Sequence, residues 1–134
     1  MIKEQKRRNG QPNEQFSILI PSWNNLPFLQ LCIHSILKNS AQKHQIIVHV
    51  NDGKDGTLNW VRAQENICYT YSEENIGVCY PLNAMRNLAR TNYLVFVNDD
   101  MYLCPNWDTH LLNAINNRED DLFFYSGTLI EPKF

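Results

Sequence analysis

Short apolar runs rich in β-branched and aromatic residues recur along the chain, and longer segments with apolar residues three and four positions apart separate them. Runs of this kind are typical of strands buried on both faces, and the wider spacing predicts amphipathic helices. The pattern predicts strands at 16–20, 45–50, 68–71 and 93–97, with a further strand beginning at 122–125. It predicts helices at 26–39, 55–66, 81–90 and 107–117.

The alternation of strands and helices predicts an α/β fold in which a mainly parallel sheet lies between two layers of helices, a three-layer α/β/α arrangement. Right-handed crossovers then bring the carboxyl ends of the strands to one edge of the sheet. Ligands of open α/β sheets bind at that edge. The candidates for chemistry are therefore the residues directly after the strands, at 21–25, 51–53, 72–77 and 98–100.

Length and composition fit one domain, since the chain has 134 residues, 43% of them hydrophobic and 19% charged. Residues 1–15 are polar and carry four Lys or Arg side chains, which predicts a flexible N-terminal tail before a domain at 16–134. The formal charge of -2 argues against nucleic acid as a partner, because nucleic-acid binding needs a strong basic footprint.

The sequence also bears on where the protein is found. Its apolar runs reach only about five residues, whereas a membrane-spanning helix needs about 20. The basic N-terminus is followed by no apolar segment, so it does not read as a secretory signal. Four cysteines without C-x-x-C spacing fit reduced thiols. We therefore expect a cytoplasmic protein, with contact at the cytoplasmic face of the membrane through the basic N-terminus as an alternative.

Two adjacent carboxylates follow the predicted strand at 93–97, in the segment Asn98-Asp99-Asp100. Carboxylates this close repel each other, and a hard cation such as Mg²⁺ or Mn²⁺ relieves that repulsion through oxygen ligands. The sequence therefore predicts a divalent-metal site here. The alternative is an Asp pair that only caps a loop.

A third carboxylate, Asp52, ends the strand at 45–50 and precedes Gly53. It could accept hydrogen bonds from a nucleobase or a ribose, or it could belong to an ordinary βα turn. The chain has no G-x-G-x-x-G or Walker sequence. A bound diphosphate would therefore be neutralised by a cation rather than by backbone amides.

Four ordered segments begin at Ile18, Val50, Glu74 and Val97 and read ILIPSWN, VNDGKDGT, ENIG and VNDDM. Together they resemble the family 2 glycosyltransferases, whose nucleotide-sugar-binding domain has the Rossmann-like GT-A fold. The resemblance identifies residues 98–100 as a DxD-like motif, in which Asp100 binds the metal and Asp99 contacts ribose or metal. It also implies nucleotide-binding roles for a further set of residues: Pro21, Ser22, Trp23, Asn24, Asp52 and Asn83.

The resemblance implies a metal-dependent, inverting enzyme that transfers a sugar from a nucleotide-diphospho-sugar (UDP-, GDP- or dTDP-linked) to a hydroxyl of a glycan or of a lipid-linked saccharide. Two alternatives stay open. One is a non-catalytic remnant of the family that binds a nucleotide or a partner chain. The other is an unrelated doubly wound domain, of phosphoryl-transfer or receiver-like type, whose acidic strand ends bind Mg²⁺.

Some positions depart from the family pattern. Leu82 stands where relatives often have Arg, and the sequence runs only 34 residues beyond Asp100. We therefore expect a truncated GT-A fold that lacks the acceptor half and any identifiable catalytic base. The sheet edge against which that half would pack predicts a homo-oligomer.

Individual aromatic and imidazole side chains also allow predictions. His49 lies inside a buried strand and is expected to be a hydrogen-bonded core residue. Trp60 and Trp107 are expected to pack helices onto the sheet. Trp23 follows a strand end, where its ring could stack on a base or could simply pack.

Overall fold

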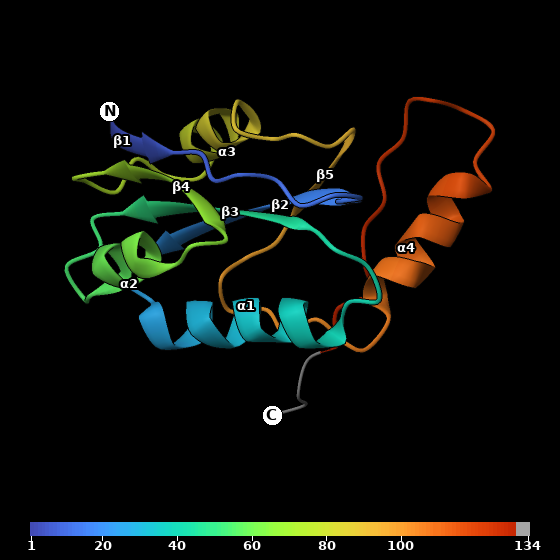
Figure 1. Cartoon of the computed structure of the whole chain (residues 1–134), viewed down its shortest axis with the longest axis horizontal. Coiled ribbons are helices and arrows are strands. Elements are labelled where there is room, and N and C mark those ends of the chain that lie inside the picture. The colour runs from blue at the N-terminus through green and yellow to red at the C-terminus, as the bar shows by residue number, and fades with distance from the viewer. Residues whose placement is uncertain (131–134) are drawn as a thin grey trace.

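The computed structural model describes residues 1–130 and shows an α/β fold built on one five-stranded sheet. The strand order is β1-β4-β3-β2-β5, with β2, β3, β4 and β5 parallel and β1 antiparallel to β4 (Figure 1). The strands are β1 (Ile2–Lys6), β2 (Phe16–Trp23), β3 (Gln45–Asn51), β4 (Ile67–Ser72) and β5 (Tyr93–Phe96). The helices are α1 (Leu26–Asn39), α2 (Thr57–Ala63), α3 (Cys79–Arg86) and α4 (Trp107–Asn116).

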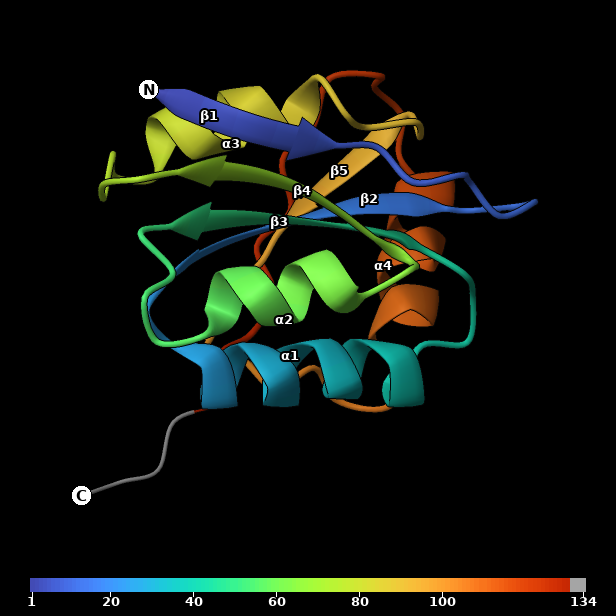
Figure 2. The same ribbon diagram turned by 60° about the vertical axis from the view of Figure 1, so that its left-hand side comes forward.

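Helices cover both faces of the sheet, as the sequence pattern predicts. α1 and α2 lie on one face and α3 on the other (Figure 2). The larger core lies under α1 and α2 and includes Ile18, Ile20 and Val48, whereas a smaller cluster with Ile47 and Met85 lies under α3. Neighbouring β3 residues alternate between these two clusters, so both faces of the strand are buried, as parallel sheets require.

Trp107 and the first turn of α4 hold this helix against the sheet. The Asp108 carboxylate is fully buried and accepts hydrogen bonds from the backbone amides of Ala41 and Gln42. His44 approaches the same carboxylate at 3.1 Å and stacks on Phe16. The predicted packing roles of Trp107 and of Trp60 are confirmed, since both contact the larger core.

The N-terminus is a strand at the sheet edge, and the prediction of a flexible tail is wrong for this segment. β1 pairs with β4 along its length, and the Glu4 carboxylate binds both Arg62 and the Tyr69 hydroxyl. These partners lie more than 50 residues away in the sequence, so local polarity could not indicate the pairing. A charged edge strand also discourages further strand addition.

The segment between β1 and β2 is held down as well. Arg90 forms a bidentate ion pair with Glu14, and its Nη1 donates to the carbonyl of Arg8 at 2.9 Å. Gly10 lies close to this guanidinium. A Cβ at position 10 would lie only 2.8 Å from Arg90 Nε, so a larger residue there would displace the arginine side chain. The sequence prediction placed the start of the domain at residue 16, but residues 8–14 make specific contacts with the rest of the domain.

The strand predicted at 122–125 is absent, which corrects the sequence prediction. Residues 122–130 have no regular secondary structure, and the side chains of Leu122 and Phe124 are 95% and 92% exposed. Phe123 alone turns inward, against Tyr93 and beneath the Arg118 guanidinium. A run of apolar residues becomes a strand only where a neighbouring strand supplies hydrogen-bond partners, and none of the five strands does so here.

Within the described part of the chain, no helix has both the length and the apolar character needed to cross a bilayer.

Candidate nucleotide-binding site

The carboxyl end of β2 contacts two of the predicted carboxylates. The Ser22 hydroxyl donates to Oδ2 of Asp99 at 2.7 Å, and the Asn24 side-chain amide donates to Oδ2 of Asp52 at 3.2 Å. β2 lies between β3 and β5 in the sheet, so the turns that follow these two strands flank its end. The tertiary structure thus brings Asp52 and Asp99 to the two sides of one strand end.

Trp23 lies between Ser22 and Asn24 in the sequence, and its side chain is 57% exposed. More than half of the ring surface is therefore open at this strand end, and its stacking on a base stays a prediction. Pro21 is buried and pairs in register with His49 of β3, so it shapes the end of the strand rather than its surface.

The backbone at this edge adopts left-handed conformations. Asn24 and Asp52 have φ of 47° and 64°, a region in which Asn and Asp are enriched among non-glycine residues. Gly53 follows at 74°, and a Cβ there would lie 2.7 Å from Val50 Cγ1. Such conformations cluster at functional sites, where the surrounding structure holds them.

Asp55 joins the turn after β3 to the start of α1. Its carboxylate accepts from the backbone amides of Leu26 and Thr57, at 2.9 and 3.0 Å. Burial alone would raise the pKa of Asp55, but these hydrogen bonds lower it below its usual value. Sequence analysis missed this residue. Its signal was an Asp two positions before a helical Thr, a spacing that favours a local side-chain-to-backbone bond.

The acidic turn after β5 lies against α1. The Cys32 thiol donates to the carbonyl of Asn98 at 3.6 Å. Burial, together with the negative charges of Asp99 and Asp100, raises the pKa of this thiol to about 12. Asp100 itself is exposed and has no hydrogen-bond or ion-pair partner among the described residues. Both carboxylates therefore lie near one another on the same turn, and Asp100 is open to a ligand.

The residues present fit a divalent ion only if a ligand completes its coordination. Among residues 1–130, no group of three or more His, Cys, Asp and Glu side chains is gathered in metal-binding geometry. Mg²⁺ commonly takes one or two protein carboxylates together with substrate phosphates, which is what Asp99 and Asp100 could supply.

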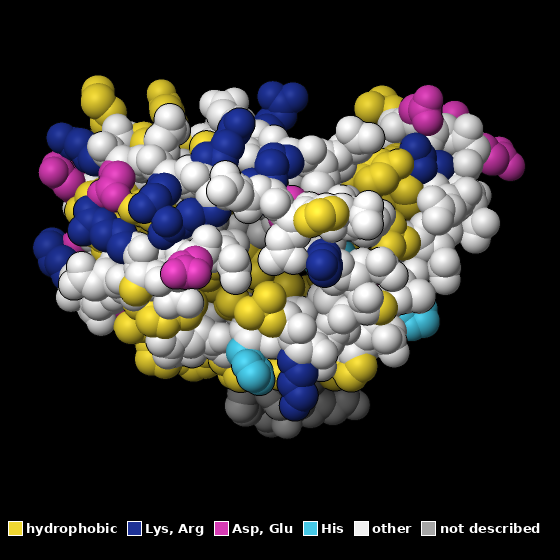
Figure 3. All heavy atoms as spheres, viewed as in Figure 1, with side chains coloured by type: hydrophobic (Ala, Val, Ile, Leu, Met, Phe, Trp, Pro, Cys, Tyr) yellow, Lys and Arg dark blue, Asp and Glu magenta, His cyan; other side chains and the backbone are white. Residues whose placement is uncertain are grey.

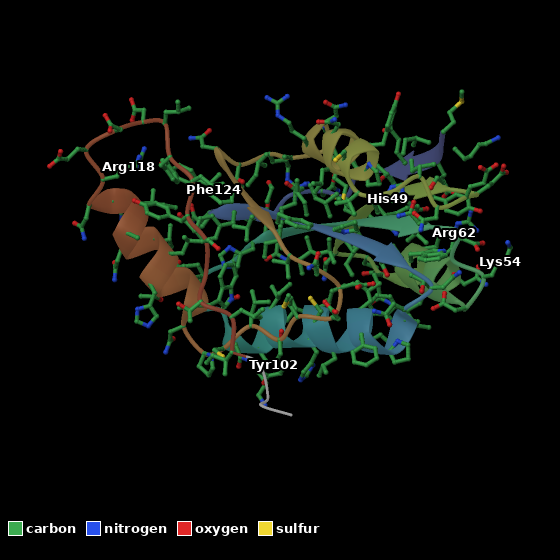
Figure 4. All side chains as sticks on the ribbon, turned by 180° about the vertical axis from the view of Figure 1, so that it is seen from behind. His49, Lys54, Arg62, Tyr102, Arg118 and Phe124 are labelled. Atoms are coloured by element: carbon green, nitrogen blue, oxygen red, sulfur yellow. The ribbon has the colours of Figure 1, made fainter. Side chains whose placement is uncertain are left out.

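Basic and acidic side chains mix at the edge where the parallel strands end, which lies at the left of Figure 1 and Figure 3. Lys54, labelled in Figure 4, approaches Oδ1 of Asp52 at 3.1 Å while its own side chain is 82% exposed. An exposed pair of this kind contributes little to stability. The lysine is therefore free to turn toward an anionic ligand.

Asn83 is the one predicted nucleotide-binding residue that lies neither at the β2 end nor in the turns after β3 and β5. It lies on the exposed side of α3, whereas its neighbour Leu82 packs against the smaller core cluster. Two surface hollows lie at the opposite edge of the sheet, lined in part by Glu14 and by His44. They contain none of the predicted site residues.

Solved structures share this fold. The structure is similar to the crystal structure of S. aureus TarS 1-349 in complex with UDP, with a TM-score of 0.63 and 18% sequence identity over 76% of this chain and 32% of that one. Another crystal structure of S. aureus TarS 1-349 gives a TM-score of 0.61 at 23% identity, over 75% of this chain and 31% of that one.

The chain belongs to glycosyltransferase family 2. The sequence profile of that family, described as "Glycosyl transferase family 2", matches residues 17–133, which confirms the resemblance seen in the four ordered motifs. An uncharacterized glycosyltransferase of Rickettsia felis is 30% identical over 87% of this chain, and the uncharacterized glycosyltransferase YfnE of Bacillus subtilis is 29% identical over 78%. The chain spans about a third or less of the length of these curated relatives.

Proposed function

We propose that this chain forms the donor-binding part of a glycosyltransferase that takes a sugar from a nucleotide-diphospho-sugar and transfers it to an acceptor hydroxyl. The observation that carries the proposal is the pair of contacts that fixes Asp52 and Asp99 on the two sides of the β2 end. Family membership and the similar fold of a UDP-bound structure support it.

Each side chain has a proposed role in holding the donor. Asp52 accepts hydrogen bonds from the nucleobase, and the exposed ring of Trp23 stacks on it. Asp99, oriented by Ser22, binds ribose or metal, and Asp100 binds the metal. Asn24 lines the pocket wall, the buried Pro21 supports the strand end beneath it, and Asn83 adds a polar group from α3.

The proposed reaction is an inverting displacement, in which the acceptor hydroxyl attacks the anomeric carbon and the nucleoside diphosphate leaves. A divalent ion, Mg²⁺ or Mn²⁺, would supply Lewis-acid stabilisation of the charge that builds on the leaving diphosphate. The chain's own residues bind and orient the donor, and no described residue is assigned as the base. The acceptor class, a glycan or lipid-linked saccharide, stays a prediction.

Calorimetry of the 134-residue chain with UDP, GDP and dTDP, each with and without Mn²⁺, tests the proposal. We expect one nucleotide to bind, more tightly with Mn²⁺, and Asp100→Ala to abolish the metal dependence. Asp121→Ala, an equally simple change at a fully exposed acid on the far side of the molecule, is the matched control. Absence of binding by all three nucleotides would overturn the proposal.

The family remnant without turnover is the competing function. Incubation of the chain with radiolabelled nucleotide-sugars separates the two, because only an enzyme hydrolyses the donor or transfers the sugar. Donor hydrolysis or sugar transfer by the chain would rule out the remnant.

A further inference from the structure

β3 carries two fully buried polar side chains at its carboxyl end, on the face that α3 covers. His49 is 0% exposed and Asn51 is 3% exposed. Figure 4 labels His49 between the sheet and α3. Burial of polar groups is unfavourable unless hydrogen bonds satisfy them. The hydrogen-bond partners of His49 and Asn51 therefore show which segments these side chains hold in place.

His49 is hydrogen-bonded at both ring nitrogens, as the sequence predicts. Nδ1 lies 2.7 Å from the Thr70 hydroxyl, and Nε2 lies 3.2 Å from both Oδ1 of Asn51 and Oγ of Ser72. An amide oxygen only accepts, so the bond to Asn51 requires the hydrogen on Nε2, and Nδ1 then accepts from Thr70. Burial lowers the pKa of His49 to about 4, which keeps the ring neutral.

The Asn51 side chain, which contacts His49, also binds the loop between β4 and α3. Its Oδ1 accepts from the backbone amide of Ile76 at 2.9 Å, and its Nδ2 donates to the carbonyl of Gly77 at 3.3 Å. α3 begins at Cys79, only two residues further on, and it carries Asn83. A single side chain therefore fixes the backbone that leads into this helix.

The same residue also fixes the turn that holds Asp52. The Gly53 amide donates to the Asn51 carbonyl at 2.8 Å, and the Asp52 amide donates to the Ser72 carbonyl at 2.9 Å. Asn51 thus makes contacts to two segments, the turn after β3 through its backbone and the loop after β4 through its side chain.

We propose that Asn51, held by His49, is a positioning residue of the nucleotide site, which keeps the loop at 74–77 in fixed register with Asp52. The inference rests on the proposed nucleotide binding and extends it to two residues that touch no ligand. Groups that orient a ligand-binding residue must themselves be locked by neighbours, and a buried, fully paired His–Asn relay provides such a lock.

Calorimetry with UDP and Mn²⁺ and amide hydrogen exchange test the proposal on matched variants. We expect Asn51→Ala to weaken UDP binding by about tenfold or more, as loss of a supporting hydrogen bond does in other sites. His49→Leu should weaken it too, whereas His49→Gln, which keeps an N–H for Asn51, should restore most of the affinity.

Gln45 provides the matched control. It lies at the opposite end of β3 on the same face, is 2% exposed and donates to the Leu88 carbonyl. Gln45→Ala should lower the melting temperature but leave UDP affinity within about twofold, because distant sites act independently. An equal effect of Asn51→Ala and Gln45→Ala on UDP affinity would overturn the positioning role.

Amide exchange separates this proposal from the proposed function. In Asn51→Ala the Ile76 amide should exchange faster, and in Gln45→Ala it should not. If the wild-type chain binds no nucleotide, the proposed function fails, and the exchange rate of Ile76 still decides whether Asn51 holds the loop. Unchanged exchange of Ile76 in Asn51→Ala would overturn the relay itself.

Discussion

The hydroxyl of Ser22, at the end of β2, donates a 2.7 Å hydrogen bond to the Asp99 carboxylate in the turn after β5. Ser22 is 2% exposed, so this bond is shielded from water. It connects the acidic turn after β5 to the buried end of the neighbouring strand β2, and the orientation of Asp99 depends on it.

Ser22→Ala should therefore weaken metal-dependent nucleotide binding while leaving the fold intact. A hydrogen bond to a charged group contributes about 1.5–3 kcal/mol, which corresponds to roughly a tenfold loss or more in affinity. Calorimetry with UDP and Mn²⁺ measures the loss. Ser40→Ala removes a hydroxyl near α4, away from the site, and is the control. Equal affinity of Ser22→Ala and wild type would show that Asp99 needs no support from β2.

Gly53→Ala should destabilise the protein more than Gly77→Ala does. Both glycines have positive φ, and a left-handed conformation costs an alanine about 1–2 kcal/mol. At Gly53 the added Cβ would also lie 2.7 Å from Val50 Cγ1, whereas at Gly77 it would meet nothing within 4 Å. We expect overpacking at Gly53 to add about 1–3 kcal/mol, measured by urea unfolding of both variants. A smaller loss for Gly53→Ala than for Gly77→Ala would contradict the close approach of Val50 to this turn.

Stability should fall as the pH is lowered from about 6.5 toward 4. Burial lowers the pKa of His49 to about 4, and burial also lowers the pKa of His44. In this range the unfolded chain binds protons that the folded chain does not, so protonation favours unfolding. The His49 contribution is at most about 3 kcal/mol, from the size of the shift.

Urea unfolding at pH 7, 6, 5 and 4 measures this slope. Burial alone would raise the pKa of Asp108, but backbone amides of Ala41 and Gln42 lower it, so its stabilising effect is lost only below the usual range of an aspartate. The two histidines therefore dominate above pH 4, and His49→Gln should flatten the profile. A wild-type profile that is flat between pH 7 and 4 would rule out a buried neutral His49.

Deletion of residues 1–6 should expose the edge of β4. β1 supplies the antiparallel partner of β4, and Glu4 binds the Tyr69 hydroxyl. Hydrogen exchange should show the β4 amides that face β1 exchanging about tenfold faster or more, which corresponds to about 1.4 kcal/mol of lost protection. Amides of β2, which is separated from β4 by β3, are the internal control. Unchanged exchange in β4 would mean that β1 does not pair stably in solution.

β5, the strand at the other edge of the sheet, is the expected site of self-association. β5 pairs only with β2 among the described strands, and its Leu94 and Phe96 side chains are 44% and 50% exposed. Light scattering should show a species larger than the monomer, and Phe96→Lys should dissociate it. Leu37→Lys, at an exposed leucine on α1, is the control. A wild-type monomer at high concentration would contradict the prediction.

Local sequence determined the elements and the order in which they occur. The runs at Phe16 and Gln45 begin strands because β-branched and aromatic residues fill both faces of a buried sheet. The helical spacing of Leu29, Cys32, Ile33 and Ile36 matches the buried side of α1. The sequence also indicated which residues follow the strands and lie at one edge of the sheet, because parallel topology brings the carboxyl ends of the strands together.

Only the tertiary structure decided which side chains meet. The links from Ser22 to Asp99 and from Asn24 to Asp52 join residues 77 and 28 positions apart, so no local pattern indicates them. Residues 2–6 form a strand because they pair with the edge of β4 and Glu4 binds Arg62. Residues 122–125 pair with no strand and have no regular secondary structure. Local propensity acts over a few residues, while strand pairing and buried hydrogen bonds depend on partners that only the folded chain brings within reach.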